Sequence, residues 1–285
     1  MNNHSLLTSI QNDRVKQWAS LLDKKYRDRL GKFIIEGVHL VKEAFAAVVE
    51  VEAVLYDAER GLPEELRELA EQTGRGSRYA ANAVAGNAEA SADVEWIQAT
   101  RPVMAKCSGT DTPPPVFAVV RKLETADDAL FSAGGLVIVL DGVRDPGNVG
   151  TIIRSADAVG ANGVVLGRGC ADLYNPKTVR STMGSLFHLP IIEADLTELL
   201  PAAQDQGFAL VGTSLNATHT CYSYDWTAPT WLLLGNESEG LSASSLEAAN
   251  ETVIIPMQGR AESLNVAMAA TVLLHEAMRQ RRFNK

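Results

Sequence analysis

The sequence predicts an α/β protein with two domains, of which the second is built on a parallel β-sheet. The chain of 285 residues is 46% hydrophobic, which is enough to fill one large or two ordinary cores. From residue 136 onward, short continuous apolar runs alternate with helix-like segments, a pattern typical of parallel strands covered by helices on both faces. A polar connection near residues 123–134 precedes this pattern. We therefore expect domains at 1–125 and 134–285, joined by a linker at 126–133.

The first domain is predicted to mix helices and strands. Val15, Trp18, Leu21 and Leu22 recur with helical spacing, and Pro63 stands where a helix can begin. In chain order, we expect a helix at 15–30, a strand at 33–37, a helix at 38–48, a strand at 51–56, a helix at 63–73 and a strand within 113–122. Residues 74–93 are rich in Ala, Asn, Gly and Ser without a clear period, and they predict a mobile surface segment.

The second domain is predicted to alternate strands and helices regularly. In chain order, we expect strands at 136–140, 163–166, 188–192, 208–214, 230–235 and 252–257. The helices between and after them are expected at 148–160, 175–186, 195–206, 242–250 and 263–282. Ligands of such parallel sheets bind beyond the carboxyl ends of the strands, so the loops that follow the strands are where a site is expected.

Composition excludes several classes of protein. No apolar stretch approaches the roughly 18 residues that a membrane span needs, and the N-terminus has no recognisable export signal, which favours the cytoplasm. Cys107, Cys170 and Cys221 are odd in number and widely spaced. This spacing favours reduced thiols and argues against a disulfide framework or a structural zinc site, so no metal is expected.

Basic residues gather near the N-terminus of an acidic chain. The net charge of −9 disfavours a nucleic-acid partner, because phosphate binding depends on Lys and Arg. Between residues 14 and 32, however, only Asp23 and Asp28 oppose seven basic residues. These are Arg14, Lys16, Lys24, Lys25, Arg27, Arg29 and Lys32. They predict either a solvated helix face with i,i+4 ion pairs or an RNA-binding patch, and charge alone does not decide between the two.

The loop after the first predicted strand of the second domain reads DGVRDPGNVGTIIR. Its glycines, proline and aspartates supply turn geometry, and Gly150 would allow another backbone to come close. Asn148 and Arg154 are nearly two helical turns apart and can project toward one end of the sheet. The loop lacks a P-loop lysine and is not GxGxxG, so a nucleotide phosphate site is poorly supported. Taken alone, it is compatible with a turn and a capped helix.

Two later loops also collect polar residues. GNESEGLS follows a buried strand directly, and its Glu237 and Glu239 need partners or water there, although a polar turn with Ser242 as a helix cap is an equal alternative. In IPMQGRAESLNV, Ser263 and Asn265 stand at the start of the final helix, where such residues are usually caps. Because all three loops follow parallel strands, together they predict one concave site containing Arg, Asn, Glu and Ser.

The motifs NVGTIIR with its DPGN lead-in, LLGNESEGLS and IPMQGRAESLNVAMAA resemble, in order and spacing, the signature motifs of the SpoU (TrmH-like) RNA ribose 2′-O-methyltransferases of the SPOUT superfamily. The resemblance is strong over residues 134–285. It is looser toward the N-terminus, where KFIIEGVHLVKEAF is similar to the small ribosomal-protein-like RNA-binding domain of many members. The 74–93 segment departs from the pattern because it is longer and richer in Ala and Asn.

The resemblance implies a fold and a chemistry that spacing alone does not give. It implies a C-terminal trefoil knot, an exception to the rule that chains stay unknotted, a homodimer, and S-adenosylmethionine bound in the knotted loops. The implied cofactor contacts are Thr213, Gly235, Asn236, Ile255, Pro256, Met257 and Leu264. The implied reaction centre is Asn148, Arg154, Glu237, Ser263 and Asn265.

The resemblance therefore implies an S-adenosylmethionine-dependent enzyme that methylates a ribose 2′-hydroxyl. Large-subunit ribosomal RNA is the favoured substrate because the N-terminal domain is sizeable, and tRNA is the alternative substrate. Arg154 either anchors the phosphate beside the target ribose or acts as the base; a free guanidinium has a pKa above about 12 and is a poor base. With this partner, the basic stretch is better interpreted as an RNA arm. A non-catalytic RNA-binding assembly factor and a nucleotide-dependent oxidoreductase are the competing hypotheses.

Overall fold

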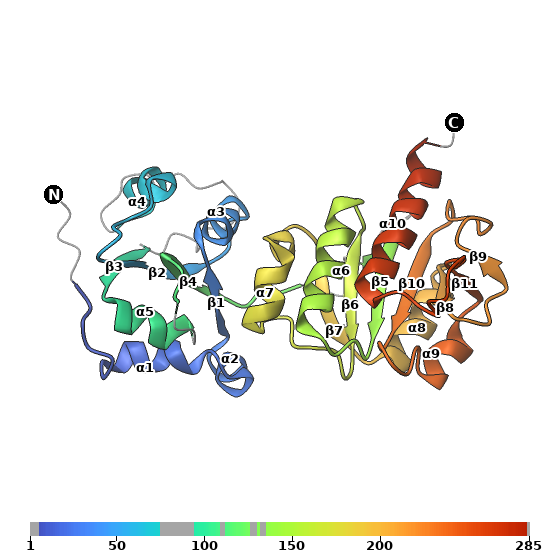
Figure 1. Cartoon of the computed structure of the whole chain (residues 1–285), viewed down its shortest axis with the longest axis horizontal. Coiled ribbons are helices and arrows are strands. Elements are labelled where there is room, and N and C mark those ends of the chain that lie inside the picture. Colours follow the sequence, from blue (N-terminus) through green and yellow to red (C-terminus); the bar gives the residue numbers. More distant parts are fainter. Residues whose placement is uncertain (1–5, 75–93, 109–111, 126–129, 132–134, 284–285) are drawn as a thin grey trace. The chain divides into compact units, whose positions relative to one another are not determined.

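The chain folds into two compact units, which are described separately below (Figure 1). The computed structural model describes residues 6–74, 94–108, 112–125, 130–131 and 135–283. The first unit contains the chain up to Leu123 together with Tyr174–Pro176, and the second contains Glu124–Leu173 and Lys177–Lys285.

The first unit is a four-stranded sheet with helices on both faces. Its strands are β1 Lys32–Glu36, β2 Val51–Asp57, β3 Glu95–Ala99 and β4 Val116–Arg121, in the order β1-β4-β2-β3. β4 is antiparallel to β1 and β2, while β2 and β3 are parallel. The helices are α1 Asp13–Ser20, α2 Lys24–Leu30, α3 Val38–Ala46, η1 Glu64–Leu66, α4 Arg67–Thr73 and α5 Arg101–Ser108. Trp18 of α1 and Met104 of α5 pack with alternate residues of β2, Ala53 and Leu55, in one core.

The single helix predicted at 15–30 is wrong. Two helices occupy this stretch, because Asn12 and Asp23 each cap a helix start: their side chains accept from the backbone N–H two residues on, at 2.9 Å in both cases. Gly31 then ends α2 with φ 64°. β3 and α5 were not predicted. Of the expected surface segment at 74–93, only Gly74 is among the described residues, where it pairs with Val94.

The second unit is the predicted parallel sheet. Its strands are β5 Leu136–Asp141, β6 Gly163–Gly167, β7 Ile191–Ala194, β8 Ala209–Thr213, β9 His219–Thr220, β10 Thr230–Gly235 and β11 Glu251–Ile254. They are ordered β7-β6-β5-β10-β8-β11-β9, and every neighbouring pair is parallel. The carboxyl ends of β10 and of its two neighbours β5 and β8 therefore meet at one edge.

Helices cover both faces of this sheet (Figure 1). They are α6 Pro146–Ala158, α7 Pro176–Thr182, η4 Ser185–Phe187, α8 Leu196–Asp205, α9 Ala243–Ala248 and α10 Val266–Phe283. α6 and α10 lie side by side, with Ser155 Oγ and Thr271 Oγ1 at 2.8 Å. On the other face, α8 packs against Val137, Trp231 and Leu233. Leu130, expected within the linker at 126–133, is fully buried in this core, so the apolar part of that stretch is not a linker.

Several element boundaries differ from the predictions. α7 ends at Thr182 rather than at 186, β7 is Ile191–Ala194 rather than 188–192, and α10 begins at Val266 rather than at 263. β11 ends at Ile254, so residues 255–257 are loop rather than strand, and the short edge strand β9 was not predicted. α6 begins at Pro146, two residues earlier than expected, because the Asp145 side chain caps it by accepting from the Asn148 N–H at 2.9 Å. None of the helices among the described residues is long and apolar enough to cross a bilayer.

The far end of α10 is tied to the segment that precedes β10. Trp226 is fully buried, and its backbone N–H donates to Gln280 Oε1 at 3.1 Å. Arg281 Nε donates to the Trp226 carbonyl at 2.6 Å, and Gln280 Nε2 donates to the Tyr224 carbonyl at 3.0 Å and to Glu276 at 2.8 Å. These hydrogen bonds fix the last turns of α10 against residues 224–228.

Candidate functional site

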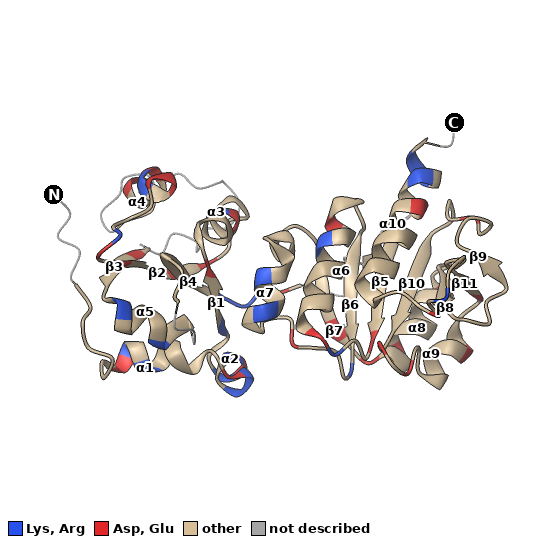
Figure 2. Cartoon of the chain, in the orientation of Figure 1, with Lys and Arg blue, Asp and Glu red and all other residues tan. Residues whose placement is uncertain are grey.

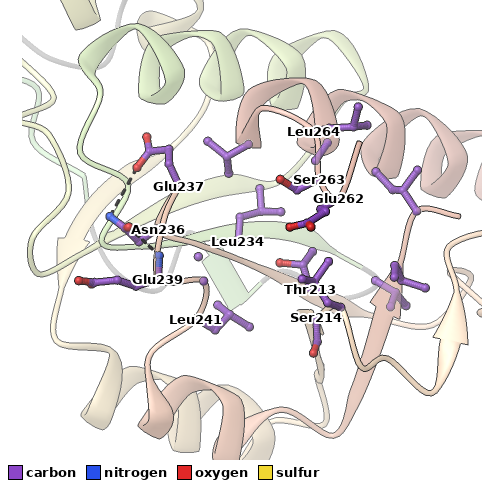
Figure 3. A pocket seen from close by; sticks show the side chains of 18 of the residues that line it. Thr213, Ser214, Leu234, Asn236, Glu237, Glu239, Leu241, Glu262, Ser263 and Leu264 are labelled. Atoms are coloured by element: carbon purple, nitrogen blue, oxygen red, sulfur yellow. Dashed lines mark hydrogen bonds between the residues drawn. The ribbon is translucent and has the colours of Figure 1, made fainter. Parts of the chain in front are cut away.

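A cavity of about 510 Å³ opens at the carboxyl edge of β8, β10 and β11 in the second unit (Figure 3). Its walls come mainly from residues 213–216, 234–241, 253–255, 257 and 262–266, and Leu273 of α10 also contributes. Leu234, Val253 and Leu273 supply apolar surface, while Thr213, Asn236 and Ser263 supply polar groups. A small-molecule site is typically a largely apolar cleft of this size with a few placed polar groups.

The cavity gathers most of the residues proposed from sequence. Of the seven cofactor positions, Thr213, Gly235, Asn236, Ile255, Met257 and Leu264 line it. Pro256 does not line it and is exposed. Among the proposed reaction-centre residues, Glu237, Ser263 and Asn265 are in the wall, and Asn148 and Arg154 are not.

The turn at 235–241 is held rigidly against the sheet. Asn236 and Gly240 exchange two backbone hydrogen bonds, of 2.8 and 3.0 Å. The Asn236 side chain accepts from the Ser238 and Glu239 N–H groups at 2.9 and 3.1 Å and donates to the Gly142 carbonyl at 2.8 Å. The turn folds back so closely that a Cβ on Gly235 would lie 2.1 Å from the Gly240 carbonyl carbon. Only glycine fits at this position.

Hydrogen bonds join the three predicted loops into one network. Asn148 Nδ2 donates to Glu237 Oε1 at 2.9 Å, and Asn265 Nδ2 donates to Asn148 Oδ1 at 3.1 Å. The Glu237 carboxylate also accepts from the Arg144 and Asp145 N–H groups, each at 3.3 Å. Asn148 does not line the cavity wall, but it is hydrogen-bonded to Glu237 and Asn265, which do.

The charge of Glu237 is set by this network. Partial burial acts to raise the pKa of Glu237, but the hydrogen bonds from Asn148 and from the backbone of residues 144 and 145 outweigh it and hold the pKa below its usual value. Glu237 is thus an anion at neutral pH. As an acceptor it fixes the Asn148 amide with its oxygen turned toward Asn265.

The start of α6 is braced from α7. Lys177 Nζ lies 2.7 Å from Asp145 Oδ2, and this pairing, together with the Asn148 N–H, lowers the pKa of Asp145. α7 approaches closely because Gly150 has no side chain: a Cβ there would lie 2.5 Å from the Thr178 carbonyl oxygen. This is the close approach that the sequence predicted for Gly150. The role of Lys177 was missed, and no motif in the sequence marks it.

Arg154 lies on α6, is exposed, and has no hydrogen bond or ion pair with the described residues. Its neighbour Ser155 contacts α10, so this part of α6 is held in place while the guanidinium extends from it. The structure therefore leaves the Arg154 side chain available to a ligand and does not place it in the cavity wall of its own chain.

The basic residues of the predicted stretch at 14–32 differ in their contacts and exposure. Arg14 pairs with Glu95 and Lys32 with Glu52, while Lys16 is 3.5 Å from Asp13. On α2, Lys24, Lys25 and Arg29 are exposed, and Figure 2 shows basic residues gathered on this helix. Lys24 Nζ lies 4.0 Å from Asp28 Oδ2, and the Arg29 guanidinium lies 4.7 Å from the centre of the Tyr26 ring.

Arg27 requires a correction. Its side chain is only 2% exposed, and its Nη1 donates to the Leu21 carbonyl at 2.7 Å. It holds α2 to the turn after α1 and is not a surface contact for RNA.

Comparisons with known proteins agree with the motifs. Residues 135–275 match the SpoU rRNA Methylase family, and residues 12–118 match the MRM3-like substrate binding domain. The chain is 33% identical to the 23S rRNA (guanosine(2553)-2′-O)-methyltransferase RlmP of Bacillus subtilis, over 94% of this chain and 97% of the relative. It is 37% identical to a 23S rRNA (uridine(2479)-2′-O)-methyltransferase of Streptomyces viridochromogenes, over 95% and 91%.

Solved structures give the same result. The SpoU methyltransferase AviRb from Streptomyces viridochromogenes, in complex with AdoMet, matches 96% of this chain and 100% of its own, with 36% identity and a TM-score of 0.82. An AdoMet-bound rRNA methyltransferase from Sinorhizobium meliloti matches 98% and 99%, with 30% identity and a TM-score of 0.82.

Proposed function

The chain belongs to the SpoU rRNA methylase family, and from this premise we propose that it transfers the methyl group of S-adenosylmethionine to a ribose 2′-hydroxyl of 23S ribosomal RNA. The observation that carries the proposal is the Asn148–Glu237–Asn265 network, which joins all three family motifs beside one cavity.

The cavity fits S-adenosylmethionine on its own chemistry. Leu234, Val253 and Leu273 give an apolar surface for an adenine ring, and Thr213 and Ser263 offer hydroxyl groups for the sugar and amino-acid parts. The rigid turn at 235–241 keeps the wall in shape before binding, which limits the loss of conformational entropy.

Positioning is the main task of the chain in this reaction. When bound, S-adenosylmethionine supplies an electrophilic methyl group, and transfer forms a carbon–oxygen bond to the ribose while a carbon–sulfur bond breaks. Asn148, fixed by Glu237, and Asn265, which caps α10 by accepting from the Ala267 N–H at 3.0 Å, orient the ribose. Arg154 anchors the adjacent phosphate through its planar guanidinium and stabilises the ribose oxygen, whose proton passes to solvent water as the carbon–oxygen bond forms.

The activity is tested by mapping 2′-O-methylation across total RNA from cells with and without the protein. Loss of one methylated nucleotide in 23S ribosomal RNA, restored by the purified protein and S-adenosylmethionine, is expected. Loss of a tRNA methylation instead would contradict the substrate. Retention of every methylation would overturn the enzymatic assignment.

Arg154→Lys tests the role of Arg154. This substitution keeps the positive charge but loses the planar guanidinium, which can donate two parallel hydrogen bonds to a phosphate. We therefore expect turnover to fall at least tenfold while the affinity for S-adenosylmethionine is unchanged. Arg282→Lys, a matched change at the far end of α10 away from the cavity, should have no effect on turnover. Near-normal turnover of Arg154→Lys would count against the phosphate anchor.

We assign residues 1–125 to RNA substrate binding, which the family match of residues 12–118 supports. Lys24, Lys25 and Arg29 of α2 form the basic surface, and Arg27 is left out because it is buried. Replacing these three with Gln should weaken RNA binding and flatten its salt dependence, with cofactor affinity unchanged. Unchanged RNA affinity would overturn the assignment.

We propose that the active form is a homodimer. Arg154 does not line the cavity of its own chain, and Leu264 and Met268 near the start of α10 are 39% and 55% exposed. Light scattering is expected to give twice the monomer mass, and Met268→Glu should shift the protein toward monomers with loss of turnover. A fully active monomer would contradict the proposal.

Two further features are proposed from family membership. We propose that the chain after β10 is threaded as a trefoil knot, a proposal compatible with the order β5-β10-β8-β11. We also propose that the protein works in the cytoplasm, where its ribosomal RNA substrate would be found.

A further inference from the structure

The wall of the cavity has an uneven charge that the proposed function does not by itself explain. Glu237, Glu239 and Glu262 line it, and none of the described lining residues is Lys, Arg or His. A concave surface with charges of one sign favours ligands of the opposite charge. The cavity should therefore prefer a cation.

The three carboxylates differ in what offsets their charge. Glu237 accepts hydrogen bonds from Asn148 and from the backbone of the first loop. Glu239 Oε2 lies 3.7 Å from Arg144 Nη2, and its carboxylate points away from Glu262 (Figure 3).

Glu262 is different. It has no hydrogen bond or ion pair with the residues that the structure describes, and its carboxylate is turned toward the side of the cavity where Asn236 lies (Figure 3). Its negative charge is thus the one that a ligand in the cavity would meet without a competing cation. Sequence reasoning missed Glu262, although it stands directly before Ser263 in the third motif.

The charge of the cofactor changes during the proposed reaction. S-adenosylmethionine has a sulfonium, an ammonium and a carboxylate, so its net charge is positive. Its demethylated product, S-adenosylhomocysteine, has a neutral thioether and no net charge. A carboxylate in the wall attracts the first ligand by charge, and it has only dipolar interactions with the second.

We propose that Glu262 makes the cavity selective for the sulfonium form of the cofactor over the demethylated product. This assignment rests on the proposed function. Because the transfer itself removes the positive charge, Glu262 holds the reactant and weakens the hold on the product. After each methyl transfer, S-adenosylmethionine therefore competes for the cavity more effectively than the demethylated product.

Calorimetric titration of the purified full-length protein tests this assignment without using turnover. The probes are S-adenosylmethionine, S-adenosylhomocysteine and sinefungin, which has a charged amine in place of the methylated sulfur. Wild-type protein is expected to prefer both cationic ligands over S-adenosylhomocysteine, and the preference should shrink as salt is raised. Glu262→Gln should reduce the preference by about fivefold, as expected for one partly exposed charge pair.

Matched variants separate charge from folding. Glu262→Asp should keep most of the preference, and Glu239→Gln should change it less than Glu262→Gln, because Arg144 already offsets that charge. Glu198→Gln makes the same charge change on α8, away from the cavity, and should leave the preference unchanged. Thermal unfolding of each variant checks that the fold is intact.

The outcomes are distinct. An equal loss of affinity for all three ligands in Glu262→Gln would mean that Glu262 binds a group common to them, and would overturn the selectivity. An unchanged preference would overturn it as well. If wild-type protein bound none of the three ligands, the proposed function itself would fail.

Discussion

Gly235 gives a prediction whose magnitude follows from the geometry of the turn. A Cβ at this position would lie 2.1 Å from the Gly240 carbonyl carbon and 2.2 Å from the Leu241 nitrogen. Both are backbone atoms of a turn that two hydrogen bonds close, so neither can move without breaking that turn. We expect Gly235→Ala to lower the free energy of unfolding by about 3 kcal/mol, the upper end of overpacking costs. The melting temperature should fall by roughly 6–12 °C.

Urea unfolding and calorimetric titration with S-adenosylmethionine measure the two consequences, lost stability and a distorted cavity wall. Two other glycines serve as controls. Gly240 has φ +72° with no atom within 4 Å of a new Cβ, so Gly240→Ala should cost only the backbone strain, about 1 kcal/mol. Gly259 has an ordinary backbone and open space, so Gly259→Ala should change stability by less than about 0.5 kcal/mol. If Gly235→Ala matched Gly259→Ala in both measurements, the close packing of the turn would be refuted.

Further predictions concern the second unit and the core of the first unit. Glu237→Gln should lower the free energy of unfolding by about 1 kcal/mol, because it removes an anionic acceptor on an exposed surface. A double-mutant cycle with Asn148→Ala should show a coupling energy of about 0.5–1 kcal/mol. Additive effects of the two substitutions would contradict the hydrogen bond between these side chains. Since the pKa of Glu237 is lowered, its contribution to stability should be complete above the ordinary glutamate pKa and be lost as pH falls through the lowered value, which acid unfolding of wild type and Glu237→Gln would reveal. Asp145→Ala removes the cap of α6 and should cost about 1 kcal/mol in chemical denaturation; no loss would show that the cap is dispensable. Burial raises the pKa of Cys107 to about 12, so the free energy of unfolding should decline as pH rises above the ordinary thiol pKa. Thiol reagents should modify Cys107 only after the protein unfolds. Rapid labelling of Cys107 in the folded protein would contradict this prediction.

The sheet and the convergence of the three loops could be predicted from sequence because each depends on local pattern. Continuous apolar runs such as 136–140 identify strands buried on both faces, and parallel strands bring their carboxyl ends to one edge. Asn148, Glu237 and Asn265 therefore had to come near one another, and they lie within hydrogen-bonding distance. Local pattern and topology together were therefore sufficient to predict the parallel sheet and the convergence of its three loops.

The features that sequence reasoning missed depend on which partners surround a side chain. Arg27 has the same charge as its neighbours on α2, and only the fold shows that its guanidinium turns inward to the Leu21 carbonyl. Glu262 is one of three similar carboxylates, and its distinction is the lack of an offsetting group among the described residues. The break between α1 and α2, in contrast, could have been found, because Asp23 is a common helix cap.

The tie between Arg281 and the Trp226 carbonyl imposes an order on folding during synthesis. Every strand of the first unit has been made once Arg121 has left the ribosome, so that unit can fold early. Gln280 and Arg281 supply hydrogen bonds to the segment around Trp226, so these bonds form only after the chain has been synthesised through Arg281. The first unit is therefore expected to fold before the second unit has acquired these hydrogen bonds.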